Sequence, residues 1–301
     1  MSTLAAAPVD APADESRKGF AFAFSAYLLW GFLPFYLKAV GHIPIFEVVA
    51  HRILWSLPIA GLVVILTGRT KELREALISP RMIGMGMLMA GFLTVNWSIY
   101  VWAIGSGHAV EGALGYYINP LISVLLAAAV LGEKLNGLQM VAVGIAAAAV
   151  ALLTWETGGL PWVSLGLAGS WGVYALLKKA LPIGANQGFF LEVLLLSPLA
   201  LICLFWVGQS GTAHFGVTGW QDTVLLMASG LVTAIPLILY ANGAKRLRLS
   251  TIAIMQYIAP TLVFLIAVFV FREPFSTVRG IAFILIWLSL VVYTWSIFRK
   301  R

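Results

Sequence analysis

Long apolar blocks alternate with short polar breaks along almost the whole chain. The blocks run to about 20 residues, and a helix of about 20 residues rises about 30 Å, the thickness of a hydrocarbon core. A transmembrane barrel would need alternating segments of about 10 residues, which the sequence lacks. The pattern therefore predicts an all-α polytopic membrane protein. Ten transmembrane helices are expected, at residues 19–38, 44–67, 82–104, 110–131, 137–155, 161–179, 187–207, 220–241, 250–271 and 277–298.

Composition and charge agree with this interpretation. Only 10% of the residues are charged and 61% are hydrophobic, against roughly 25% charged residues in soluble domains. Lys and Arg divide between the two sides of the predicted map as 15 against 3, with Arg52 left inside a span. The positive-inside rule then places both termini in the cytoplasm. The net charge of +7 follows from this topology, because the basic residues lie at helix ends and form no nucleic-acid-binding patch.

The two halves of the chain are similar at a constant offset. Residues of the first half recur 140 positions later, in the pairs Tyr100 and Tyr240, Tyr117 and Tyr257, Pro120 and Pro260, and Glu133 and Glu273. We expect two five-helix repeats, at 19–156 and 157–301, after a disordered cytoplasmic tail at 1–18 that is rich in Ala, Pro and acidic residues. Because five is odd, the repeats are inverted. Inverted repeats commonly build transporters with a substrate site near the bilayer midplane.

Two repeat-equivalent prolines are candidate hinges. Pro120 and Pro260 are expected near the middle of the fourth and ninth spans. Proline lacks an N–H group, so the carbonyls of Tyr116 and Gln256, four residues earlier, lose their helical partners and become available to a ligand. A packing kink is the alternative explanation. Polar and aromatic residues beside the prolines join the candidate cavity: Tyr117, Asn119 and Tyr257.

The second span carries three ionisable residues in the run EVVAHRILW. Arg52 lies about 12 Å into the helix, where a charge is costly unless it is paired or hydrated. Two interpretations stay open. Arg52 forms a structural ion pair with Glu47 or with Glu192 of the seventh span, or it faces a cavity and meets a substrate carboxylate. Glu47 and Glu192 are also candidate proton sites, and His51 is either a proton carrier or a buried neutral histidine.

Aromatic residues recur at mid-span positions, some of them beside glycine. Placement at the membrane interface fits those positions poorly. We expect them to line a cavity for organic substrates, with these members: Tyr27, Trp30, Trp97, Tyr100, Trp171, Tyr174 and Tyr240.

Enzymatic and metal chemistry has little support in the sequence. Cys203 is the only cysteine, so a metal site with Cys and His ligands in the usual number is not expected. The three aspartates lie in the tail or at a helix end, and no phosphate-binding glycine loop with its lysine occurs. We therefore expect no catalytic residue, no metal and no cofactor.

Several runs carry a resemblance to a known family. SAYLLWGFLPFYLK, EVVAHRILWS, NWSIYVWAI, GYYINPLISVLL and IMQYIAP, followed by FREP, look like the RarD branch of the EamA family in the drug/metabolite transporter superfamily. The likeness runs from Gly19 to Arg301 and is carried most specifically by AHR together with YYINP.

The resemblance implies export of small metabolites through a central cavity, with amino acids as the best-supported substrate class. A permease for drugs of the chloramphenicol type is the alternative, and a lipid-modifying membrane enzyme is the runner-up class. Expected partners are a small-molecule substrate and the lipid bilayer, without nucleic acid. The expected location is the bacterial inner membrane, with a monomer as the working assembly.

Overall fold

The computed structural model describes residues 13–68, 70–131, 135–180, 182–244, 246–247 and 255–298, and every regular element in this part of the chain is helical. The helices are α1 Ala13–Ala39, α2 Ile45–Leu66, α3 Thr70–Ile78, α4 Pro80–Gly105, α5 Ala109–Leu131, α6 Gly137–Thr157, α7 Trp162–Ala180, α8 Ala185–Gln209, α9 Trp220–Ala244, α11 Ile258–Leu265, the π-helix η1 Ile266–Val270 and α12 Thr277–Phe298. All ten expected spans overlap these helices.

The apolar character of the helices suits a bilayer. Seven of them in the described residues are long and apolar enough to cross a membrane, namely α1, α2, α4, α6, α8, α9 and α12, and the apolar segment 258–270 is shorter. Large side chains such as Trp155, Phe205 and Val291 are more than half exposed. Such a surface is costly in water and favourable against lipid.

The start of the first helix and the presence of one short helix differ from the expectation. Helix α1 begins at Ala13, so the end of the expected tail is helical, and residues 1–12 lie outside the described part. The short helix α3 was not predicted. Its first turn is attached to the start of α8, because Gln187 Nε2 donates to the Glu72 carboxylate at 2.7 Å.

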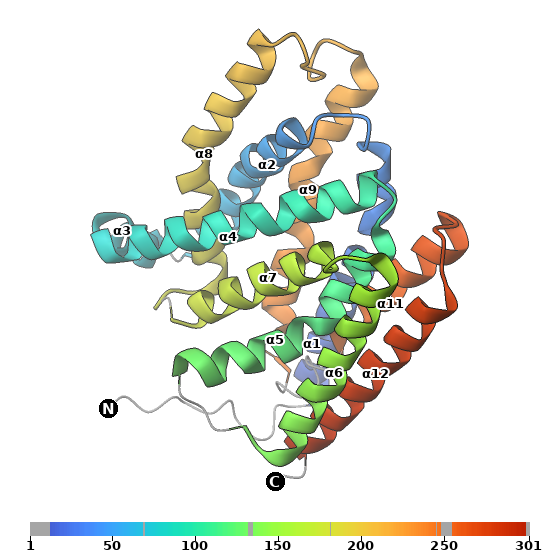
Figure 1. Cartoon of the computed structure of the whole chain (residues 1–301). Helices are drawn as coiled ribbons and strands as arrows, with labels where there is room; N and C mark the ends of the chain where they lie inside the picture. The colour runs from blue at the N-terminus through green and yellow to red at the C-terminus, as the bar shows by residue number, and fades with distance from the viewer. Residues whose placement is uncertain are drawn as a thin grey trace.

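The helix packing follows a paired pattern (Figure 1). Helix α1 packs on α9 and α4 packs on α7, while α5 packs on α7 and α1 packs on α11. The pairs α2–α8 and α6–α12 also lie side by side. If each helix is replaced by its predicted counterpart in the other half, the contact α1–α9 becomes α7–α4, and the contact α5–α7 becomes α11–α1.

Helices α2 and α9 approach closely at a glycine. A Cβ atom added to Gly230 of α9 would lie 2.3 Å from the backbone carbonyl of Trp55 in α2. Real Cβ atoms do not come this close, so only glycine fits. This approach brings the middle of α9 against the ionisable face of α2.

One end of the bundle, which we call the basic-poor end, contains the loops at 40–44, 106–108, 158–161, 210–219 and 271–276. Two buried carboxylates connect the halves there. Glu47 accepts hydrogen bonds of 2.9–3.1 Å from the N–H groups of residues 214 and 215. Glu273 accepts bonds of 2.8 and 2.9 Å from those of residues 109 and 110, at the start of α5. Each carboxylate therefore holds backbone from the other half.

Candidate functional site

The strongest candidate site is the buried guanidinium of Arg52 on α2. Arg52 is 4% exposed. Its Nε donates to Thr233 Oγ1 of α9 at 3.1 Å, and its Cζ lies 4.9 Å from the ring centroid of Trp97 on α4. Its Nη1 is buried and has no hydrogen-bond partner among the described residues. A buried donor without a partner is expensive and rare in folded proteins, so this nitrogen is available to an anion.

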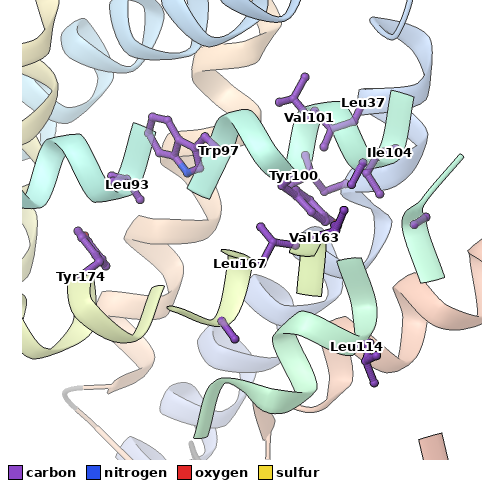
Figure 2. Close-up of a cluster of buried hydrophobic side chains, with 14 of the residues drawn as sticks. Leu37, Leu93, Trp97, Tyr100, Val101, Ile104, Leu114, Val163, Leu167 and Tyr174 are labelled. Carbon is purple, nitrogen blue, oxygen red and sulfur yellow. The ribbon is translucent and has the colours of Figure 1, made fainter. Parts of the chain in front are cut away.

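Tyrosine phenols surround the guanidinium. Those of Tyr36, Tyr100 and Tyr116 lie close enough to interact with it electrostatically. Tyr100 and Tyr116 pack edge to face, with ring centroids 5.2 Å apart. Figure 2 shows Trp97 and Tyr100 about one turn apart on α4 within the buried cluster. The setting combines one cation, hydroxyl groups and aromatic faces, which suits an organic anion.

A second unpartnered polar atom lies beside Arg52. Ser56 follows one turn later on α2 and is completely buried, and within the part of the chain that the structure describes its Oγ makes no hydrogen bond. Residues four apart share a helix face. Arg52 and Ser56 thus present two unsatisfied groups on the same side of α2.

The ion pairs considered for Arg52 do not form. Glu47 bonds to the backbone at residues 214 and 215, and its Oε2 lies 3.3 Å from His214 Nδ1. Glu192 pairs with Lys178 at 2.5 Å and accepts from the Tyr174 hydroxyl at 3.1 Å. The ion-pair interpretation of Arg52 is therefore wrong for the described part of the chain. Spacing along α2 could not show that Glu47 bonds to the loop before α9, or that Glu192 pairs with Lys178 of α7.

His51 belongs to the basic-poor end. Its Nδ1 accepts from Trp55 Nε1 at 3.1 Å, which requires Nδ1 to be unprotonated in this conformation. The ring packs on Phe215, with centroids 4.6 Å apart. His51 therefore packs with the loop that Glu47 holds.

The other aromatic candidates form separate groups. Tyr27, Trp30 and Tyr240 lie together between α1 and α9, with ring centroids 5.6–6.0 Å apart. Trp171 packs on Tyr174 at 5.4 Å, beside Glu192. The expected cavity residues thus form three clusters, of which one contains Arg52, while Tyr174 and Tyr240 of the other two lie close enough to interact electrostatically.

The two expected hinges differ from each other. Pro120 lies inside α5 as predicted. Helix α11 begins at Ile258, so Pro260 lies in its first turn, where a missing N–H group interrupts no bond. The ninth span is thus interrupted just before Pro260, and its residues 250–254 lie outside the described part of the structure. Gln256 and Tyr257 lie in the turn before α11.

Of the two polar candidates beside Pro120, Tyr117 already has partners, whereas Asn119 keeps an unpartnered atom among the described residues. Tyr117 bonds to Thr261 at 2.6 Å and stacks on Tyr257 at 6.2 Å. The Oδ1 atom of Asn119 is buried and has no partner.

Sequence reasoning missed several contributors. Pro58 lies inside α2 and Pro198 inside α8, at the same offset of 140 that identified the repeat, so this signal was available. No such signal marks the polar residues around Arg52, which only the packing brings there: Tyr36, Ser56 and Thr233. Lys178, which pairs with Glu192, does recur at this offset, with Lys38.

Two cavities lie away from Arg52. One of about 200 Å³ opens near the starts of α5, α7 and α12. The other, of about 360 Å³, is apolar and lies between α2 and α9, beside Trp55 and Pro58. Arg52 lines neither of these two cavities, and at 4% exposure its side chain is enclosed in this conformation. Among the described residues no group of three or more His, Cys, Asp or Glu side chains could hold a metal ion.

Comparison with known proteins agrees with this architecture. Residues 17–155 match the EamA-like transporter family. The chain is 41% identical over 285 residues to the uncharacterized transporter YojE of Bacillus subtilis, covering 94% of this chain and 95% of that protein. It is 40% identical over 289 residues to protein RarD of Streptomyces exfoliatus, covering 95% and 91%.

A further relative and a solved structure are also similar to this chain. The chloramphenicol-sensitive protein RarD of Pseudomonas aeruginosa is 32% identical over 285 residues, covering 93% of this chain and 95% of that protein. A solved crystal structure shares the fold, with a TM-score of 0.60 at 22% identity over 95% of this chain and 99% of the other. The identity to the RarD proteins over nearly their whole length leads to one conclusion: the chain belongs to the EamA-like transporter family, in its RarD-like branch, and is a multi-pass membrane transporter.

Proposed function

We propose that this transporter exports small organic metabolites, amino acids foremost, and that Arg52 binds the substrate carboxylate. The observation that carries the proposal is the buried Nη1 of Arg52, which has no partner. A carboxylate would supply a charge-assisted hydrogen bond and neutralise a cation that is costly inside a membrane. The phenols of Tyr100 and Tyr116 would surround the bound group.

The proposed mechanism is alternating access between two inverted five-helix repeats, crossing the membrane ten times in all. The exchangeable packing of α1–α9 with α4–α7 supports this proposal, because an inverted repeat relates these pairs to each other. The bonds from Glu47 and Glu273 would have to break when the basic-poor end opens. In this proposal the basic-poor end faces away from the cytoplasm and both termini lie inside, in the inner membrane of a bacterium; the charge bias supports this orientation.

A permease for uncharged drugs is a second candidate. The aromatic groups around Trp97 and Tyr100 favour it, as does the printed name of the chloramphenicol-sensitive relative. The two candidates differ in their dependence on Arg52, since a drug without an anionic group gains little from the guanidinium.

Flux into liposomes tests the proposal. Purified protein should exchange labelled amino acids down a gradient, and Arg52→Met should reduce the rate at least tenfold. Arg81→Gln, which changes an exposed residue at the start of α4, serves as the matched control and should keep the rate. If no amino acid moves, or if Arg52→Met transports as fast as the control, the proposal is wrong. Chloramphenicol flux that is independent of Arg52 would favour the second candidate.

A further inference from the structure

A half-open cavity of about 200 Å³ lies at the basic-poor end, away from Arg52. The starts of α5, α7 and α12 and the end of α6 enclose it. Glu111 and Arg279 line it together with apolar and aromatic side chains. We propose that this cavity binds a zwitterion with a primary ammonium group and an oxyanion, held by Glu111 and Arg279 respectively.

The two charged groups keep unused bonding capacity. Arg279 Nη2 lies 3.9 Å from Glu111 Oε1, which is too far for a hydrogen bond. Arg279 Nη1 donates to the Pro274 carbonyl at 3.0 Å. Within the described residues, no donor bonds to the Glu111 carboxylate. The side chains are 24% and 21% exposed, so each is partly desolvated and only weakly compensated by the other.

Helix stability does not explain Arg279. It lies in the first turn of α12, where the positive end of the helix dipole disfavours a cation. Glu111 lies in the first turn of α5, where a carboxylate is favoured by the same effect. The position of Arg279 is therefore unfavourable locally, and an anion in the cavity would compensate it. A carboxylate or a phosphate matches the planar guanidinium.

The remaining walls suit the apolar part of an amphipathic ligand. Phe283 is buried and Trp162 is 52% exposed, and both line the cavity. Trp162 is held by Trp102, with ring centroids 4.9 Å apart, and Trp102 stacks on His108 at 4.8 Å. An ordered aromatic wall beside a pair of opposite charges matches an amino acid with an apolar side chain. It equally matches the headgroup of an aminophospholipid, which shares the ammonium and the oxyanion.

Calorimetric titration of the purified full-length protein tests this site, in wild type and in an Arg52→Met background that removes the proposed transport site. The probes are leucine and dihexanoyl phosphatidylethanolamine, with dihexanoyl phosphatidylcholine as the probe whose quaternary ammonium has no N–H donor. At least one of the first two should bind in both backgrounds. Arg279→Gln and Glu111→Gln should each weaken that binding at least tenfold, and Arg279→Lys should weaken it less.

The outcomes separate the sources of the ligand. Binding of leucine alone assigns the cavity to a free amino acid, and binding of the ethanolamine lipid alone assigns it to a headgroup. Absence of binding by both probes overturns the proposal. Equal binding of the choline lipid, or unchanged binding in correctly folded Glu111→Gln and Arg279→Gln proteins, also overturns it. Because the site is separate from Arg52, failure here leaves the proposed transport function intact, and the flux assay can fail independently.

Discussion

Two of the buried charged groups, on the adjacent helices α2 and α8, have opposite sign and different surroundings. Arg52 of α2 and Glu192 of α8 are separated by 140 residues, the offset of the sequence repeat, and the two helices pack on each other. Glu192 is satisfied by Lys178 and Tyr174, whereas Arg52 retains an unpartnered nitrogen. The contrast suggests that one position stabilises the fold and the other is kept for a ligand.

The largest expected effect is on Glu192. Replacing it with Ala leaves Lys178 without its carboxylate, and breaking a buried pair in this way costs about 3–5 kcal/mol. We expect a large drop in the thermal unfolding temperature in detergent. The double variant Lys178→Met with Glu192→Leu should recover most of the loss, because both charges are removed together. If Glu192→Ala is as stable as wild type, Glu192 does not stabilise the fold, and the contrast with Arg52 is wrong.

The glycine contact between α2 and α9 comes next. Gly230→Ala forces a Cβ against the backbone of Trp55, and overpacking of this kind costs about 1–3 kcal/mol. Gly169→Ala on α7 is the matched control, since nothing lies within 4 Å of its Cβ position. Thermal unfolding of both variants measures the difference. Equal stability would show that the close approach is not required.

A smaller effect is expected at Thr233. Its hydroxyl accepts the hydrogen bond from Arg52 Nε, so Thr233→Val removes a partner without changing the shape much. The KM for amino-acid flux should change severalfold while the protein remains folded, and Thr233→Ser should behave like wild type. If valine leaves the KM unchanged, the orientation of Arg52 does not depend on this bond.

The smallest effect on stability is expected at Arg52 itself. Arg52→Met removes a buried charge that the protein does not fully compensate, so the unfolding temperature should stay the same or rise. This result would be opposite in sign to that of Glu192→Ala. A loss as large as the one at Glu192 would mean that Arg52 is structural too.

The helices were predictable from the sequence because length and hydropathy define a membrane span locally. Helix α3 was missed because it is short and polar, and only its contact with α8 identifies its place. The sequence placed Arg52 inside a span, but it could not decide between an ion pair and a side chain that, among the described residues, has no carboxylate partner. Glu47 is five positions from Arg52, but the backbone at residues 214 and 215 takes its hydrogen bonds. Cross-helix contacts of this kind have no local signature.

The helix boundary near Pro260 was also not predictable from the sequence. The predicted repeat pairs it with Pro120, yet α11 begins just before Pro260 while α5 continues through Pro120. Similar sequence at equivalent positions does not guarantee the same helix boundary, because tertiary packing decides where a helix begins. The two repeats therefore share residues without sharing every local conformation.

Ligand-induced stabilisation tests the central claim about Arg52 most directly. The thermal unfolding temperature of the purified protein would be measured with leucine and with leucinamide, which lacks the carboxylate but keeps the ammonium and side chain. A ligand that binds the folded state raises this temperature, and at a given concentration a tighter ligand raises it more. In an Arg279→Gln background, which removes the second proposed site, we predict that leucine raises it, that leucinamide does not, and that adding Arg52→Met abolishes the response to leucine. Equal stabilisation by leucinamide, or a full response in Arg52→Met, would contradict the account.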